Sequence, residues 1–193
     1  EPICNMEECN KVVLIASEIQ VPADLCLPLS GALIDWIKNS NASAAIMIDA
    51  YSPGVENKHT IFDEDDSDGS LLGIGSVEES HKILDGLKIP LLKQGIIGGM
   101  TGVMMGESRR RSVNTVAMLA EASGEFGNGT IPDSRAAARI INCLDKLLPA
   151  IYLDSEPLLE EAQRIEEQIR EMMALQLNPS AEHATNDSAN MYG

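Results

Sequence analysis

Residues 113–148, VNTVAMLAEASGEFGNGTIPDSRAAARIINCLDKLL, decide the fold of this 193-residue chain. The stretch opens with an apolar run over 113–120 that predicts a strand. Three glycines over 124–129 then predict a loop. Residues 133–148 carry apolar side chains at helical spacing, which predicts a helix. A strand, a loop and a helix of these lengths form one unit of an α/β domain.

The same alternation runs through the rest of the chain. Strands are predicted over 11–17 (KVVLIAS, buried on both faces), 44–51, 58–62 and 71–74. Helices are predicted over 25–40, 78–87 and 100–110. The first helix has Asp24 as its N-cap and an apolar face made of Leu29, Leu33, Trp36 and Ile37. Repeated strand–helix units of this size predict a mostly parallel sheet with helices on both faces.

The longest predicted helix, 155–177, divides the chain into a body, 1–177, and a tail, 178–193. Ser155 is its expected N-cap. A coiled-coil-like seam of about two heptads consists of Leu158, Ala162, Ile165, Ile169 and Met172. The seam either packs on the domain or also helps to form an oligomer. The tail, NPSAEHATNDSANMYG, has too little apolar surface to order itself.

The overall charge and the cysteines exclude several classes of function. A formal net charge of −16 argues against nucleic acid and anionic membranes as partners. No apolar run approaches the ~18 residues that a membrane span needs, and no secretory signal is visible. The four cysteines form no C-x-x-C pair, so reduced thiols in a cytoplasmic protein are expected, with no metal site and no cofactor.

The last three residues, Met191, Tyr192 and Gly193, are a candidate binding site. They place a hydrophobic side chain, a tyrosine and a carboxylate at the tip of a polar tail, where the tyrosine has nothing to pack against within its own chain. A partner pocket with a cation or backbone N–H groups can capture such an ending. The alternative is that the ending is accidental.

Three stretches in a fixed order carry a resemblance to a known family. They are 94–107 (QGIIGGMTGVMMGE), 116–148, and 151–173 (IYLDSEPLLEEAQRIEEQIREMM). In this order they resemble the archaeal branch of the proteasome assembly chaperone family. The resemblance implies a three-layer α/β/α domain related to the nucleoside-phosphorylase-like folds. It also implies homo-oligomers that bind the α-subunits of the proteasome core particle without catalysing a reaction.

The end of the chain matches a motif of that family, whereas its beginning lacks an element that the family usually has. Met191, Tyr192 and Gly193 match the hydrophobic–tyrosine–any-residue tail (the HbYX motif) with which some archaeal members dock between α-subunits. The family usually opens with an extra strand and a Pro-Gly turn, which are not found before Lys11. Either the chain is truncated or its N-terminus has diverged.

A glycine-rich loop at 95–106 is the second candidate site, with Gly98, Gly99, Thr101 and Gly102 as its ligand-binding residues. A glycine turn before a helix can hold an anion with backbone N–H groups. The spacing fits neither G-x-G-x-x-G nor the P-loop, and close helix packing explains the glycines equally well. As a ligand site, this loop would serve the alternative function, an ATP-grasp-like ligase or a phosphorylase- or hydrolase-like enzyme.

Charged residues supply the remaining candidates. Asp49 and Glu121 end predicted strands, where they form an acid–base pair, cap helices or lie in solvent. The acidic run 63–68 lacks the Gly and Glu of a calcium loop and is expected to be a solvated loop. Arg109, Arg110 and Arg111 follow a predicted helix and are expected to form internal or inter-subunit salt bridges.

Overall fold

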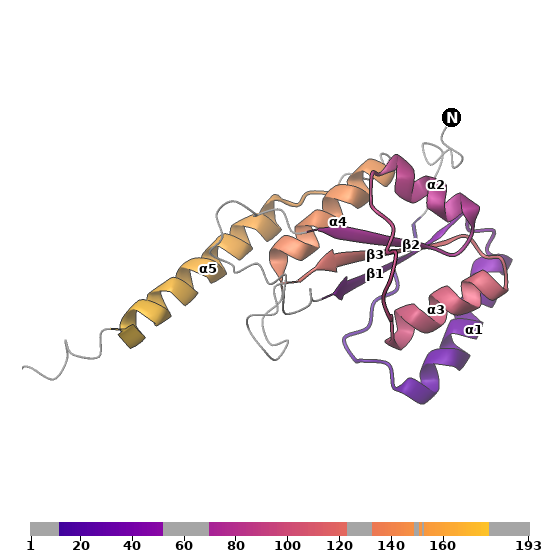
Figure 1. The fold of residues 1–193 in the computed structure, drawn as a ribbon, viewed down its shortest axis with the longest axis horizontal. Helices are drawn as coiled ribbons and strands as arrows, with labels where there is room; N and C mark the ends of the chain where they lie inside the picture. Colours follow the sequence, from indigo (N-terminus) through magenta and orange to yellow (C-terminus); the bar gives the residue numbers. More distant parts are fainter. Residues whose placement is uncertain (1–11, 52–69, 123–132, 149–150, 152, 178–193) are drawn as a thin grey trace, which may run out of the picture.

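A computed structural model describes residues 12–51, 70–122, 133–148, 151 and 153–177 (Figure 1). The predicted α/β class is confirmed, while the predicted strand over 58–62 lies outside the described residues. In chain order the elements are α1 (Ala23–Asn39), β1 (Ala45–Tyr51), β2 (Leu71–Gly75), α2 (Glu78–Gly86), α3 (Gly99–Arg110), β3 (Thr115–Glu121), α4 (Ser134–Leu147) and α5 (Glu156–Leu177).

The three strands form one mixed sheet in the order β1-β3-β2. Strand β1 runs parallel to β3, with Tyr51 opposite Glu121. Strand β2 runs antiparallel to β3, with Gly73 opposite Met118. The described strands therefore form a mixed sheet and do not confirm the predicted mostly parallel one. An apolar run indicates that a strand is present but not its direction, which depends on pairing with residues far away in the sequence.

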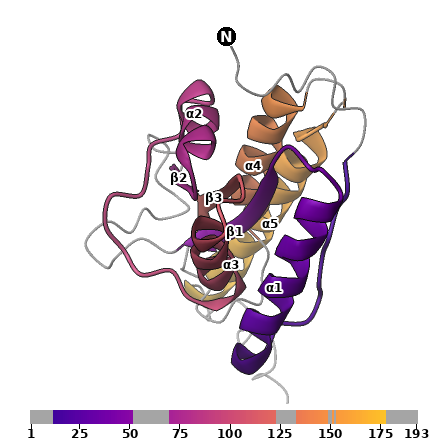
Figure 2. The ribbon, with the colours of Figure 1, turned by 90° about the vertical axis from the view of Figure 1, so that its right-hand side faces the viewer.

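Helices cover both faces of this sheet, and β3 lies at its centre. Val116 and Met118 pack with Ile140 of α4 on one face. The alternate residues of β3 point to the other face, where Ala117 packs with Met105 of α3. Helices α1 and α3 pack against each other (Figure 2), and apolar side chains of both form one cluster with Ala45 and Met47 of β1. Burial on both faces explains why β3 reads as a continuous apolar run.

Helix α1 differs from its prediction in its start and in its buried face. It begins at Ala23 after Pro22, and Asp24 lies in its first turn instead of capping it. Its buried residues are Cys26, Ser30, Ile34 and Ile37. Leu29 and Trp36, predicted to be on the buried face, are 40% and 44% exposed. The helix is apolar on two adjacent faces, and only one of them contacts α3.

The predicted buried strand at 11–17 is not present. Residues 12–17 belong to no strand, and Val12, Val13, Leu14 and Ile15 are all more than half exposed. A run of β-branched residues becomes a strand only when a neighbour supplies backbone hydrogen bonds. None of the strands in the described part of the chain pairs with this run.

The last two helices pack against each other. The Asp133 carboxylate caps α4 by accepting a hydrogen bond from the Ala136 N–H at 2.8 Å. Ser155 immediately precedes α5, at the predicted N-cap position, and its carbonyl accepts hydrogen bonds from the Leu158 and Leu159 N–H groups. Its hydroxyl contacts Asn142 Oδ1 of α4 at 2.7 Å and so links the two helices. Ala162 of the predicted seam is buried. The side chains of Ile169 and Met172 lie outside the described part. Figure 1 shows α5 running past the end of the sheet.

Candidate functional site

The predicted docking residues Met191, Tyr192 and Gly193 lie outside the described residues. The element that leads to them is α5, which ends at Leu177. A 22-residue helix is about 33 Å long. The start of the tail therefore lies about that far from the first turn of α5.

The glycine-rich loop leads into α3, and packing accounts for part of it. Gly102 donates its N–H to the Gly98 carbonyl at 3.1 Å. A Cβ at Gly102 would lie 2.1 Å from the carbonyl oxygen of Ile97, so only glycine fits there. Thr101 is buried, which removes its hydroxyl from solvent. Of the four predicted ligand residues, Gly102 is therefore required by packing and Thr101 is buried.

The other two glycines have open surroundings. Gly98 is the N-cap of α3, and Gly99 has a φ of +62°, in the left-handed region that favours glycine. A Cβ added at either position would meet nothing within 4 Å. The backbone turn explains Gly99, and Gly98 is the one predicted loop residue with neither a packing nor a dihedral requirement.

A polar cluster lies where β1 and β3 end. The Glu121 carboxylate accepts hydrogen bonds from the Ser70 N–H at 3.0 Å and from the Ser70 hydroxyl at 2.7 Å. The Tyr51 hydroxyl contacts the same carboxylate oxygen at 3.3 Å and also the Ser70 hydroxyl. Arg139 of α4 donates from Nη2 to the Glu121 carbonyl, while its Nε is buried without a hydrogen-bond partner.

The cluster changes the acidity of its tyrosine. Burial raises the pKa of Tyr51, the hydrogen bond between Tyr51 and Ser70 lowers it, and the Glu121 charge raises it further. Of the predicted acid–base pair, Glu121 lies in this cluster. Asp49 instead accepts a hydrogen bond from the Ala50 N–H at 2.8 Å on the exposed side of β1. Sequence reasoning missed Tyr51, Ser70 and Arg139, because they come together only when β1 pairs with β3.

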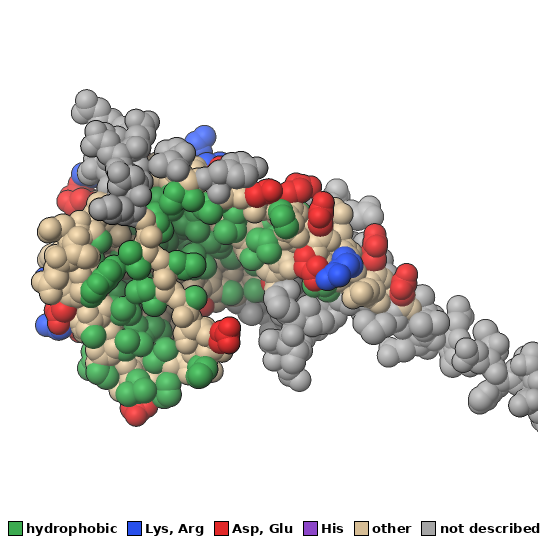
Figure 3. Space-filling view, turned by 180° about the vertical axis from the view of Figure 1, so that it is seen from behind, with side chains coloured by type: hydrophobic (Ala, Val, Ile, Leu, Met, Phe, Trp, Pro, Cys, Tyr) green, Lys and Arg blue, Asp and Glu red, His purple; other side chains and the backbone are tan. Residues whose placement is uncertain are grey.

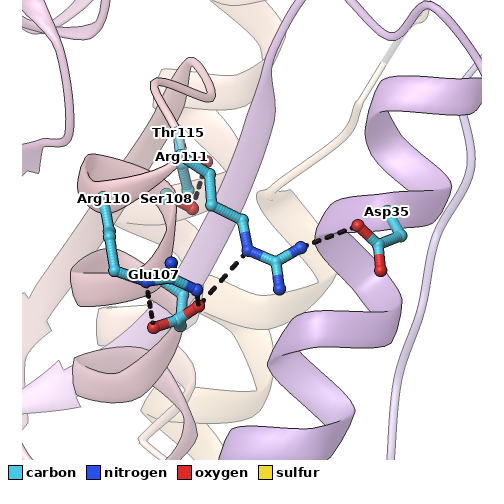
Figure 4. Close-up of polar contacts among 6 residues, drawn as sticks. All are labelled: Asp35, Glu107, Ser108, Arg110, Arg111 and Thr115. Atoms are coloured by element: carbon cyan, nitrogen blue, oxygen red, sulfur yellow. Dashed lines mark hydrogen bonds and ion pairs between the residues drawn. The ribbon is translucent and has the colours of Figure 1, made fainter.

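The predicted internal salt bridges are confirmed for Arg110 and Arg111 of the arginine cluster (Figure 4). Arg110 contacts Glu107 at 2.5 Å, and Arg111 Nε lies 3.3 Å from the same carboxylate. Arg111 also reaches Asp35 on α1, with 2.7 Å between Nη1 and Oδ1. The hydrogen bond from Arg110 is the main cause that lowers the pKa of Glu107. Arg111 therefore links the end of α3 to α1, while Arg110 pairs within its own helix.

The described residues contain no group of three or more His, Cys, Asp or Glu side chains placed to hold a metal ion. Cys26 and Cys143 are both free and buried, and Cys143 has a pKa raised by burial. None of the helices in the described ranges is long and apolar enough to cross a membrane. The acidic run 63–68 lies outside the described residues.

Solved structures of other proteins share this fold. Pyrococcus furiosus PbaA, described as an archaeal homolog of proteasome-assembly chaperone, is 30% identical with a TM-score of 0.68, over 84% of this chain and 62% of PbaA. Pyrococcus furiosus PbaB, described as an archaeal proteasome activator, is 20% identical with a TM-score of 0.61, over 81% of this chain and 62% of PbaB. A Mycobacterium tuberculosis proteasome-assembly chaperone homologue, Rv2125, is 13% identical with a TM-score of 0.55, over 77% of this chain and 57% of Rv2125.

The chain matches only part of the length of these solved structures, whereas the family model matches most of this chain. This chain spans about 62% of the length of PbaA and of PbaB. At their low identities, PbaB and Rv2125 show the fold alone. No curated protein sequence matches the chain. The PAC2 family matches residues 3–173, which include every described helix and strand except the last turn of α5. The chain therefore belongs to the PAC2 family.

Proposed function

We propose that this chain is a non-enzymatic proteasome assembly chaperone or adaptor, which docks Met191, Tyr192 and Gly193 into pockets between α-subunits of the proteasome core particle. The observation that carries the proposal is this C-terminal ending on a chain of the PAC2 family, whose relative PbaA is described as a homolog of a proteasome-assembly chaperone. The proposed location of the protein is the cytoplasm.

Each terminal residue has its own role in this docking. The Tyr192 ring packs in the pocket and its hydroxyl finds a hydrogen-bond partner. Met191 fills an adaptable apolar niche, and the Gly193 carboxylate pairs with a lysine of the α-subunit. The 16 residues of 178–193 have a typical reach of about 20–24 Å if flexible. Helix α5 adds to that reach because it carries the start of the tail past the sheet (Figure 1).

Self-association belongs to the same proposal. The chain forms homo-oligomers, so that several tails act on one ring of α-subunits. Tails joined in this way bind by avidity, which raises the overall affinity well above that of a single tail.

The test is native mass spectrometry of archaeal proteasome α-rings mixed with the intact chain or with a chain that ends at Asn190. We expect binding by the intact chain alone. A chain with one glycine added after Gly193 keeps all side chains but moves the carboxylate, and we expect it to bind much more weakly. Equal binding by all three chains would refute docking through the tail.

The enzyme alternative, an ATP-grasp-like ligase or a phosphorylase- or hydrolase-like enzyme, has less support from the geometry. In its loop, a side chain at Gly102 would collide with the Ile97 backbone, and Thr101 is buried. A thermal-shift screen with nucleotides tests it directly, because a saturated site raises the melting temperature.

A further inference from the structure

Helix α1 is apolar on two adjacent faces, while Asp24, Asp35 and Lys38 make its remaining side polar. Its buried face contacts α3, and a second face beside it carries Leu25, Leu29 and Trp36, which are 50%, 40% and 44% exposed. These residues follow at spacings of four and seven, so they lie along one stripe of the helix. An apolar helix face is ordinarily packed against another element. None of the described helices or strands packs on this second face of α1 closely enough to bury it.

The segment that leads into α1 extends this surface. Val12, Val13, Leu14, Ile15 and Ile19 are 51% to 83% exposed. Figure 3 shows hydrophobic side chains gathered over this end of the molecule. The term α1 face is used below for these five residues together with Leu25, Leu29 and Trp36.

The α1 face has the size of a protein–protein interface. Its exposed fractions correspond to roughly 800 Å² of apolar surface, which is about what each partner of a standard interface buries. A typical monomer exposes a largest apolar patch of only about 300–600 Å². Asp35, the residue next to Trp36 in the sequence, has its charge balanced by an ion pair with Arg111.

We infer that the α1 face is covered by a second copy of this chain. The inference rests on the self-association proposed above and names its surface. The chain carries a formal net charge of −16, so two copies repel each other unless their contact keeps the acidic regions apart. Exposed acidic residues line α5 at the other end of the molecule (Figure 3), and an α1 contact holds the two α5 helices apart by more than a screening length of about 8–10 Å.

Helix α5 offers less surface for the same purpose. Ala162 of its predicted seam is 5% exposed, and Leu158 and Ile165 are already partly buried. The described part of its apolar stripe is thus largely used within the chain, where α5 packs against α4. A contact through α1 also leaves the end of α5 at Leu177 clear for the docking proposed above.

The only tryptophan in the sequence, Trp36, reports on this contact directly. We expect the intact chain to form one defined oligomer in sedimentation velocity. On dilution, its Trp36 emission should shift to longer wavelength as the ring returns to water. Leu29→Asp and Leu14→Asp should each raise the dissociation constant by about 100-fold or more, because each would bury an unpaired carboxylate. Leu14 is 83% exposed and outside any helix, so that variant leaves the fold intact.

Leu27→Asp is the matched control. Leu27 lies on the same helix and is 58% exposed, but it is off the stripe, so its variant should associate as the intact chain does. An intact chain that is monomeric at all concentrations would overturn both this inference and the proposed self-association. An oligomer that survives Leu29→Asp and Leu14→Asp but dissociates with Ile165→Asp would overturn the α1 face alone and place the contact on α5. Binding of the tail to α-rings is measured separately.

Discussion

Arg111, just after the end of α3, places its guanidinium 2.7 Å from the carboxylate of Asp35 on α1. The two residues are 76 positions apart in the sequence, and the same guanidinium also lies against Glu107. The pair thus joins the two helices that stack on one face of the sheet.

Removal of this link should loosen the α1–α3 contact. We expect Arg111→Ala to lower the free energy of unfolding by about 1 kcal/mol, because a half-exposed ion pair contributes little and the buried stem of the arginine contributes the rest. Arg109→Ala, at an exposed position of the same helix, should stay within about 0.5 kcal/mol of the unmodified chain. Urea unfolding measures both, and equal values would show that Arg111 is not the link.

The lowered pKa of Glu107 predicts a dependence of stability on pH. A carboxylate whose pKa is lower in the folded than in the unfolded state stabilises the fold above its usual pKa near 4.5. That contribution is lost as the pH falls through the lowered folded value. The difference in unfolding free energy between the unmodified chain and Glu107→Gln should therefore be constant near neutral pH and shrink below about pH 4.5. A difference that stays constant down to acid unfolding would contradict the role of the arginines.

Ser108 of α3 and Thr115 of β3 share a buried hydrogen bond, with 2.9 Å between their hydroxyl oxygens. Both side chains are 0% exposed. Ser108→Ala leaves the Thr115 hydroxyl without its acceptor and should cost about 1–3 kcal/mol of unfolding free energy. Adding Thr115→Val should recover part of that loss, because neither polar group then remains. A purely additive double variant in a thermal or urea series would argue against direct coupling.

The Tyr51 cluster makes a prediction about titration. Glu121→Gln removes a negative charge beside the tyrosine, so the pKa of Tyr51 should fall back toward 10. The ultraviolet absorbance of tyrosinate follows this change, and Tyr51→Phe identifies its signal among the three tyrosines of the chain. An unchanged titration in Glu121→Gln would mean that burial alone raises the pKa.

Local patterns in the sequence predicted those parts of the fold that depend on local physics. The helix over 133–148 and the strand over 113–120 correspond to α4 and β3, because periodicity and burial on both faces leave a direct trace in the residue types. The salt bridges of Arg110 and Arg111 were predictable because a basic helix end in an acidic chain attracts carboxylates.

The features that were missed depend on pairing between distant segments. The direction of β2, the unpaired run at 12–17 and the cluster of Tyr51 with Ser70, Glu121 and Arg139 each require knowledge of which strands are neighbours. The buried face of α1 was also mispredicted because it depends on a distant segment. Its two apolar faces look alike in the sequence, and only the position of α3 decides which one is buried.

Gly102 and Gly106 of α3 provide a matched pair that tests the role of the glycine-rich loop. Gly102→Ala would put a Cβ 2.1 Å from the Ile97 carbonyl oxygen, and because that atom belongs to the backbone we expect a loss of at least about 2 kcal/mol. Gly106→Ala meets nothing within 4 Å on an exposed position of the same helix, so it should stabilise the fold by about 0.5–1 kcal/mol. Urea unfolding of both variants compares them under the same conditions. A tolerated Gly102→Ala would remove the packing explanation of Gly102 and return it to the ligand-binding residues of the loop.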